Sequence, residues 1–234
     1  MKKTNTIFLP LILTAFLLVG CKGAKITYDE AVLKVTAIQE HYDDEDVKVP
    51  SKMEVVSEFK GDISSTETGT SKQTVRYDGD AKYYFMSSES TTSEETEYTK
   101  IWIYYDVKAN KTYVVSEDND AKEYSVLDGD QFADATFVIS PVLAIQSAMV
   151  YVLPMYLEIT EGDERNIYRS SGEGSIYFKV FEEDSDAFLE VEIANFLIAS
   201  AYLFEDENNY SRSKAKYTSV STAKPNLSNY ELAE

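Results

Sequence analysis

The chain has 234 residues, in which 41 acidic side chains stand against 22 basic ones and give a formal net charge of -19. A chain with this excess of acids is not expected to form an extended basic surface that neutralises phosphates. We therefore expect no nucleic-acid partner. With 44% hydrophobic and 13% aromatic residues the chain is too apolar to be disordered. Its single cysteine excludes an intramolecular disulfide framework and a zinc site built on several cysteines.

The amino terminus has the layout of an export signal. A short basic segment, residues 1–3, precedes an apolar run over residues 7–19. A permanent membrane span needs about 20 apolar residues, so this run is short for a span and typical of a signal peptide. It closes on Leu-Val-Gly-Cys at residues 18–21. We expect residues 1–20 to be removed on export.

This tetrapeptide resembles the lipobox of bacterial lipoproteins, and the resemblance implies a fatty modification at Cys21. A thiol at the membrane surface can become a diacylglyceryl thioether, and the small Gly20 lets a peptidase approach the bond before it. Two or three acyl chains, at about 0.8 kcal/mol per buried CH₂, hold a protein on a membrane. We expect residues 21–26 to be a lipidated tether on the extracytoplasmic side of the cell membrane. If the leader stayed attached, Cys21 would be an ordinary small core residue.

A helix is predicted directly after the tether. Thr27 and Glu30 have the spacing of a capping box, in which each side chain accepts a hydrogen bond from the backbone of the other. Apolar residues then recur at helical spacing, and four acids at residues 43–46 are unfavourable at a helix C-terminus. The pattern predicts an amphipathic helix over residues 28–42.

Strands dominate the rest of the chain. From Lys52 the hydrophobic period changes to two, which indicates a strand with one covered face. Further strands are predicted over residues 73–78, 82–88, 98–106, 112–116, 122–126, 175–182, 187–193, 196–205 and 210–220. The Ser/Thr/Glu-rich stretch 87–97 is predicted to be a hairpin loop between two of them. We expect one domain over residues 27–234.

Between Asp134 and Glu158 the chain carries no charge. Ser140-Pro141 is a typical helix start, and Pro154 should end or kink that helix near residues 150–153. A transmembrane helix is disfavoured by two prolines, by acidic flanks and by the lack of a nearby cluster of Lys and Arg. A plain core helix is the second interpretation.

The third interpretation is a helix that covers an apolar ligand. A helix that is apolar on all sides must be enclosed on all sides, whereas one sheet covers only one of them. The first helix or a second one near residues 130–137 could supply the remaining cover, or a ligand could. For a ligand cavity the candidate residues are Phe137, Ile145, Met149 and Val152.

The order of these features is similar to that of the LolA-like and LppX-like envelope lipoproteins. A lipobox and short tether are followed by an amphipathic helix, a strand meander, an uncharged helix and final strands that close on Lys-Tyr-Thr-Ser-Val at residues 216–220, before Pro225. The resemblance implies an α+β fold, with one large curved antiparallel sheet, a half-barrel, and two or three helices on its concave face. It also implies a hydrophobic cavity for acyl chains. No ligand-binding residue of that family can be assigned to this chain by a shared motif.

Motifs of catalysis are absent from the sequence. There is no Gly-x-Ser-x-Gly, no Gly-rich phosphate loop and no His-Glu-x-x-His, and His41 is interpreted as an exposed partner of local carboxylates. We expect no enzyme activity, no cofactor and no metal site. The leading hypothesis is a membrane-anchored lipoprotein that binds a hydrophobic or lipid ligand. The alternative is a surface interaction or structural lipoprotein with a filled core.

Overall fold

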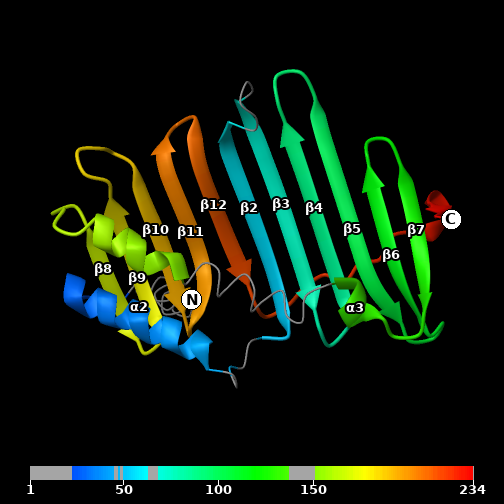
Figure 1. The fold of residues 1–234 in the computed structure, drawn as a ribbon, viewed down its shortest axis with the longest axis horizontal. Coiled ribbons are helices and arrows are strands. Elements are labelled where there is room, and N and C mark those ends of the chain that lie inside the picture. The colour runs from blue at the N-terminus through cyan, green and yellow to red at the C-terminus, as the bar shows by residue number, and fades with distance from the viewer. Residues whose placement is uncertain (1–22, 45–46, 48–49, 63–67, 137–150, 234) are drawn as a thin grey trace, which may run out of the picture.

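The computed structural model describes residues 23–44, 47, 50–62, 68–136 and 151–233. All strands of this part of the chain belong to one open sheet (Figure 1). Across the sheet their order is β1-β8-β9-β10-β11-β12-β2-β3-β4-β5-β6-β7-β13. The predicted α+β class, with one large sheet and helices packed on it, is confirmed.

The sheet is built from two hairpin meanders. The first comprises β2 (Lys52–Asp62), β3 (Thr68–Asp78), β4 (Tyr83–Thr91), β5 (Thr96–Asp106), β6 (Lys111–Asp118) and β7 (Lys122–Asp128). The second comprises β8 (Ile167–Gly172), β9 (Ser175–Phe181), β10 (Phe188–Ala194), β11 (Leu197–Asp206) and β12 (Asn209–Lys216). The meanders join where β12 pairs antiparallel with β2, with Lys214 opposite Val56.

Two short strands close the edges of the sheet. On one side β1 (Ala24–Lys25) pairs antiparallel with β8, and on the other β13 (Glu231–Leu232) pairs with β7. The β13 pairing is parallel, so the sheet is antiparallel everywhere else in the described residues but not throughout. Such short edge strands limit the exposed backbone that a second chain could pair with.

The helices lie on one face of the sheet (Figure 1). Helix α2 (Tyr28–Asp43) begins with the predicted capping box, since Glu30 N donates to Thr27 Oγ1 and Thr27 N donates to Glu30 Oε2. Residues 151–159 are also helical and cross β8–β11 beside α2. The short α3 (Phe132–Thr136) stacks Phe132 on Tyr77 of β3.

The main core lies between these two helices and the second meander. Val35 and Ile38 of α2 and Leu153 and Leu157 of the 151–159 helix are each 1% exposed and meet Phe178 of β9, which is 0% exposed. Truncating a core side chain of this size to alanine typically costs about 2–5 kcal/mol. The helices are therefore fixed to β8–β11 by apolar burial.

A second cluster lies on the reverse face, over the first meander. Tyr83, Phe85, Tyr104 and Val115 are buried there, partly under Leu227 and Tyr230. These two residues belong to the C-terminal strap, residues 217–233, which crosses behind the sheet to β7 (Figure 1). The hydroxyl of Tyr83 donates to the carbonyl of Ala223 at 2.9 Å, which fixes the strap.

Several predicted boundaries were wrong. The hairpin loop expected over residues 87–97 is mostly strand, because Ser88 faces Thr99 and Glu89 faces Tyr98 in a regular ladder that leaves only residues 92–95 as the turn. Hydroxyl and β-branched side chains fit such cross-strand pairs. The last long strand ends at Lys216, not at residue 220, because the chain there turns into the strap.

Two further elements differ from expectation. Strand β8 was not predicted, and β1 lies inside the expected tether. The predicted uncharged helix is described only from residue 151, where it continues through Pro154 to residue 159, because Leu153 and Leu157 are buried on both sides of the proline. Within the described ranges no helix has both the length and the apolar content needed to cross a membrane.

Candidate functional site

The two faces of the sheet differ in charge. On the helix-bearing face an outer row of paired residues runs across six strands: Val180, Leu189, Leu203, Ser211, Phe59 and Ser71. The inner row next to it is Phe178, Val191, Ala201, Ser213, Ser57, Gln73 and Ser88. Neither row contains a charge.

The reverse face between these two rows is strongly charged. Its paired residues are Lys179, Glu190, Tyr202, Arg212, Glu58, Lys72 and Glu89. Because side chains alternate between the faces of a strand, the sequence confines the charges of β9–β12 and β2–β4 largely to one side. The two uncharged rows lie on the side that carries the helices.

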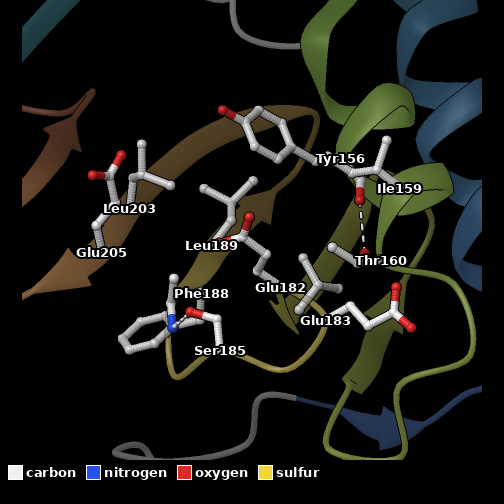
Figure 2. A pocket seen from close by; sticks show the side chains of 12 residues that line it. Tyr156, Ile159, Thr160, Glu182, Glu183, Ser185, Phe188, Leu189, Leu203 and Glu205 are labelled. Atoms are coloured by element: carbon white, nitrogen blue, oxygen red, sulfur yellow. Dashed lines mark hydrogen bonds between the residues drawn. The ribbon is translucent and has the colours of Figure 1, made fainter.

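A groove of about 800 Å³ opens on the helix-bearing side, between the end of the 151–159 helix and β9–β11 (Figure 2). Its floor consists of Val180, Leu189 and Leu203, and its wall is formed by Tyr156 and Ile159. Ile159 is 66% exposed, so the wall itself presents apolar surface. The groove is therefore apolar below and along one side.

The end of the helix is tied to the sheet by one asparagine. Asn166 Nδ2 donates to the carbonyl of Thr160 at 2.6 Å, and the backbone N of Phe181 donates to Asn166 Oδ1 at 2.9 Å. Thr160 Oγ1 in turn donates to the carbonyl of Tyr156 at 2.7 Å. These bonds set the distance between the helix wall and the β9 floor.

An arginine fixes the rim of the groove. Arg165 donates to the carbonyls of Ser185 and Glu182 at 2.7 and 2.9 Å, and so holds the turn between β9 and β10. Its guanidinium also lies 4.7 Å from the ring centroid of Phe181 and is bound by Asp163 at 2.6 Å. The hydrogen bonds from Arg165 lower the pKa of the Asp163 carboxyl, which stays ionised and keeps the arginine in place.

Acids stand around the groove. Glu182, Glu183 and Glu205 line it, and none of the three forms an ion pair within the described part of the chain. Like charges repel at this range, so a phosphate or carboxylate placed at the rim would be disfavoured. The arrangement suits an apolar molecule without negative charge.

The residues predicted for a ligand cavity have mixed outcomes. Phe137, Ile145 and Met149 lie outside the described residues, as does Cys21. Val152 is described, is 39% exposed and does not line the groove, because Leu153 and Leu157 occupy the side of the helix that faces the sheet.

The groove residues were missed by sequence reasoning. Tyr156 belongs to the predicted uncharged stretch and Ile159 lies just beyond its end at Glu158, but nothing in the chain marks which side of this helix meets β9–β11. Leu189 and Leu203 lie in predicted strands, and only the register places them in one row. His41, expected to be an exposed partner of carboxylates, stacks on Phe196 with ring centroids 4.1 Å apart.

No protein-family model matches the chain, and a search of curated proteins found no relative. Among the described residues, no three His, Cys, Asp or Glu side chains are grouped in a way that could hold a metal ion. What the groove can bind is therefore inferred from its lining residues.

Proposed function

We propose that the protein is an exported lipoprotein, anchored through Cys21 on the extracytoplasmic side of the cell membrane, that binds a hydrophobic or lipid ligand without catalysing a reaction. The observation that carries this proposal is the groove between the 151–159 helix and β9–β11, whose floor and one wall are apolar. Its volume of about 800 Å³ lies in the range of small-molecule sites, roughly 300–1,000 Å³.

Ligand affinity would come from burial of apolar surface. Transfer of apolar area from water contributes about 25 cal/mol per Å², and the floor of Val180, Leu189 and Leu203 offers such area. The outer and inner rows contain no charge, so a ligand that covers them does not remove an ionised group from water. Both features favour a ligand with at least one hydrocarbon part.

The short tether would keep the sheet close to a membrane. Only Lys22 and Gly23 separate Cys21 from β1, whose Ala24 pairs with Ser170 of β8. Gly23 has φ of +83° and a Cβ there would come within 2.2 Å of the Ser170 carbonyl, so glycine is required at this bend. An acyl anchor at Cys21 would hold the edge of the sheet next to the lipid.

Ligand binding is tested by native mass spectrometry of the full chain, released from its membrane. We expect a co-purified apolar molecule on the unaltered protein and its loss in Leu203→Glu, because a carboxylate would then occupy the groove floor. Leu127→Glu places the same change on a 39% exposed leucine of β7, away from the groove, and should keep the ligand. A ligand-free protein, or equal occupancy of both variants, would contradict the proposal.

The anchor is tested separately by feeding radiolabelled palmitate to cells that make the protein. We expect label on the intact chain and none on Cys21→Ser, because the serine hydroxyl cannot form the thioether. The variant should also move from the membrane fraction unless its leader remains uncleaved, which its mass would reveal. Unlabelled wild-type chain would refute lipidation and leave the ligand proposal standing.

A second candidate, a surface interaction protein without a small ligand, is favoured by the reverse face. Phe181, Phe188 and Phe204 lie there half-buried, with Lys179 Nζ 3.5 Å from the ring centroid of Phe188. Aromatic rings beside cations are common in protein interfaces. A ligand-free mass spectrum, together with a partner whose binding Phe204→Ala abolishes, would select this candidate.

A further inference from the structure

A second, smaller pocket of about 170 Å³ lies on the same face of the sheet, directly beside the groove. It is lined by Ser57, Phe59, Ser71, Gln73, Ser88 and Ser211, together with Glu58, whose carboxylate is bound by Arg212 on the reverse face at 2.7 Å. Ser211 pairs with Leu203 of the groove floor. Paired residues on neighbouring strands lie about 5 Å apart, so the two sites adjoin each other.

The side chains of the two rows change from apolar to polar between β11 and β12, and on both sides of this boundary they are uncharged. On β9–β11 both rows are aliphatic or aromatic, whereas on β12, β2, β3 and β4 they carry hydroxyls, one amide and the ring of Phe59. A molecule that covers both halves would meet an apolar surface first and then an uncharged polar one. Such a surface is complementary to an amphiphile with a neutral head.

Within the described residues, the polar side chains of the small pocket have few partners. The hydroxyls of Ser57, Ser71, Ser88 and Ser211 make no side-chain hydrogen bond to the described part of the chain. The Gln73 amide has only a weak contact there, 3.9 Å from Met86 Sδ. Hydroxyls both donate and accept, and an amide offers two donors and an acceptor, so together they can pair with several hydroxyls of one ligand.

Charge decides between kinds of head group. Phosphate or carboxylate would find no cation in either row, and the groove beside it is lined by Glu182, Glu183 and Glu205. An ammonium head would find no carboxylate free in the small pocket, because the Glu58 carboxylate is already paired with Arg212. A neutral head with several hydroxyls satisfies both constraints, and the ring of Phe59 offers a flat apolar surface to the CH groups of a sugar or polyol.

We infer that the ligand is a neutral amphiphile whose hydrocarbon part occupies the groove and whose polyhydroxylated head, a sugar or a polyol, lies over the small pocket. This inference rests on the proposed function, because the groove must hold the hydrocarbon part. It adds the class of head group and the side chains that select it.

The test uses the full chain in phosphatidylcholine vesicles and three probes that share one photoactivatable acyl chain. The probes are a monoglucosyl diacylglycerol, a glyceryl-headed polyol ether of the same diacylglycerol, and phosphatidylglycerol, with the plain diacylglycerol as reference. After illumination, the labelled fraction is read from the mass of the intact protein. We expect the two neutral hydroxylated probes to label roughly tenfold more than the reference, as one or two net hydrogen bonds would give, and phosphatidylglycerol to label less.

Two double variants separate the head site from the groove. Ser57→Ala with Ser88→Ala removes two hydroxyls of the inner row and should reduce the labelling by hydroxylated probes to that by plain diacylglycerol. Ser87→Ala with Ser200→Ala makes the same change at half-buried serines of the reverse face and should leave the preference intact. If only the glucosyl probe shows the preference, the head group is a sugar; if only the polyol ether shows it, the head group is a polyol.

The outcomes distinguish the two proposals. Equal labelling by all probes, or strongest labelling by phosphatidylglycerol, overturns the head-group inference while the groove still binds hydrocarbon. A preference that survives in the Ser57/Ser88 variant overturns the assignment to this pocket. If none of the probes labels the protein, the proposed function itself is contradicted.

Discussion

The carboxylate of Glu117 is bound by residues from distant parts of the chain. Tyr230 of the C-terminal strap donates to its Oε2 at 2.5 Å, and the Nζ atoms of Lys100 and Lys122 each lie 3.2 Å from Oε1. The hydrogen bond from Tyr230, with those from the two lysines, lowers the pKa of Glu117 to about 2 against the opposing effect of burial. One carboxylate thus joins β5, β6, β7 and the strap.

This low pKa predicts a specific pH dependence of stability. The unfolded-state pKa of a glutamate is about 4.3, so the ionised network stabilises the fold above about pH 5 and loses this effect as the pH falls toward 2. We expect Glu117→Gln to lower the free energy of unfolding by about 2 kcal/mol at neutral pH, and by about half as much near pH 3. Urea unfolding of the full chain in detergent, followed by circular dichroism, measures both values.

The matched control for this prediction is Glu123→Gln. Glu123 is exposed, lies on the neighbouring strand, and its side chain makes no ion pair within the described residues. Its free energy of unfolding should be unchanged at either pH. Equal losses for Glu117→Gln at both pH values would show that the network stabilises through packing and not through charge.

At the residue scale, prediction from sequence succeeded where the interaction is local. The capping box of Thr27 and Glu30 follows from their spacing alone and is present. Leu189, Leu203 and Ser211 come together only through pairing across β10, β11 and β12, and Glu117 meets Tyr230 only through the strap. Side chains joined by non-local pairing carry no marker in the sequence.

The helix that forms the groove wall depends on one connection at its end. Asn166 is the residue that links Thr160, at the end of that helix, to Phe181 of β9. Replacing it with alanine would leave a carbonyl and an N–H without their partner. An unmade hydrogen bond of a buried group costs about 1–3 kcal/mol.

We therefore expect Asn166→Ala to loosen the wall while the sheet stays folded. Hydrogen exchange of the Phe181 amide should become faster, and ligand occupancy of the groove should fall, because its two sides are no longer held at a fixed distance. Asn229→Ala, in the short 3₁₀ turn Leu227–Asn229 of the strap, is the control and should change neither quantity. Unchanged exchange at Phe181 would show that packing of Leu153 and Leu157 suffices to hold the helix.

At the element scale, strong periodicity gave correct strands and weak periodicity did not. The predicted 28–42 helix and most hairpin strands of both meanders are present. Strand β8 escaped because Ile-Tyr-Arg-Ser-Ser-Gly has only two apolar residues and lies near an edge. The 87–97 stretch was assigned to a loop because its polarity was given more weight than its alternation, although both of its strands are paired.

The whole sheet depends on the junction between its two meanders. β12 has β11 on one side and β2 on the other, so its backbone is paired on both edges. A proline in the middle of such a strand removes a ladder hydrogen bond and costs about 3 kcal/mol or more.

We expect Ser213→Pro to separate the meanders. Its urea midpoint should fall well below that of the wild type, and proteolysis should cut near residues 209–216. Ser219→Pro introduces the same residue into an exposed, non-helical and unpaired position of the strap and should be nearly neutral. Similar midpoints for both variants would mean that the β12–β2 pairing contributes little to the fold.

The β12–β2 junction also has a consequence for how the molecule is made. β2 emerges early during synthesis, yet its partner on one side appears only when residues 209–216 have followed. Until then the nascent chain presents an open strand edge whose one face is uncharged, which is a template for aggregation. A chain that stalls before residue 209 would therefore be prone to aggregate, and chaperones that shield β2 would matter more for this protein than for one whose meanders are closed by neighbouring hairpins.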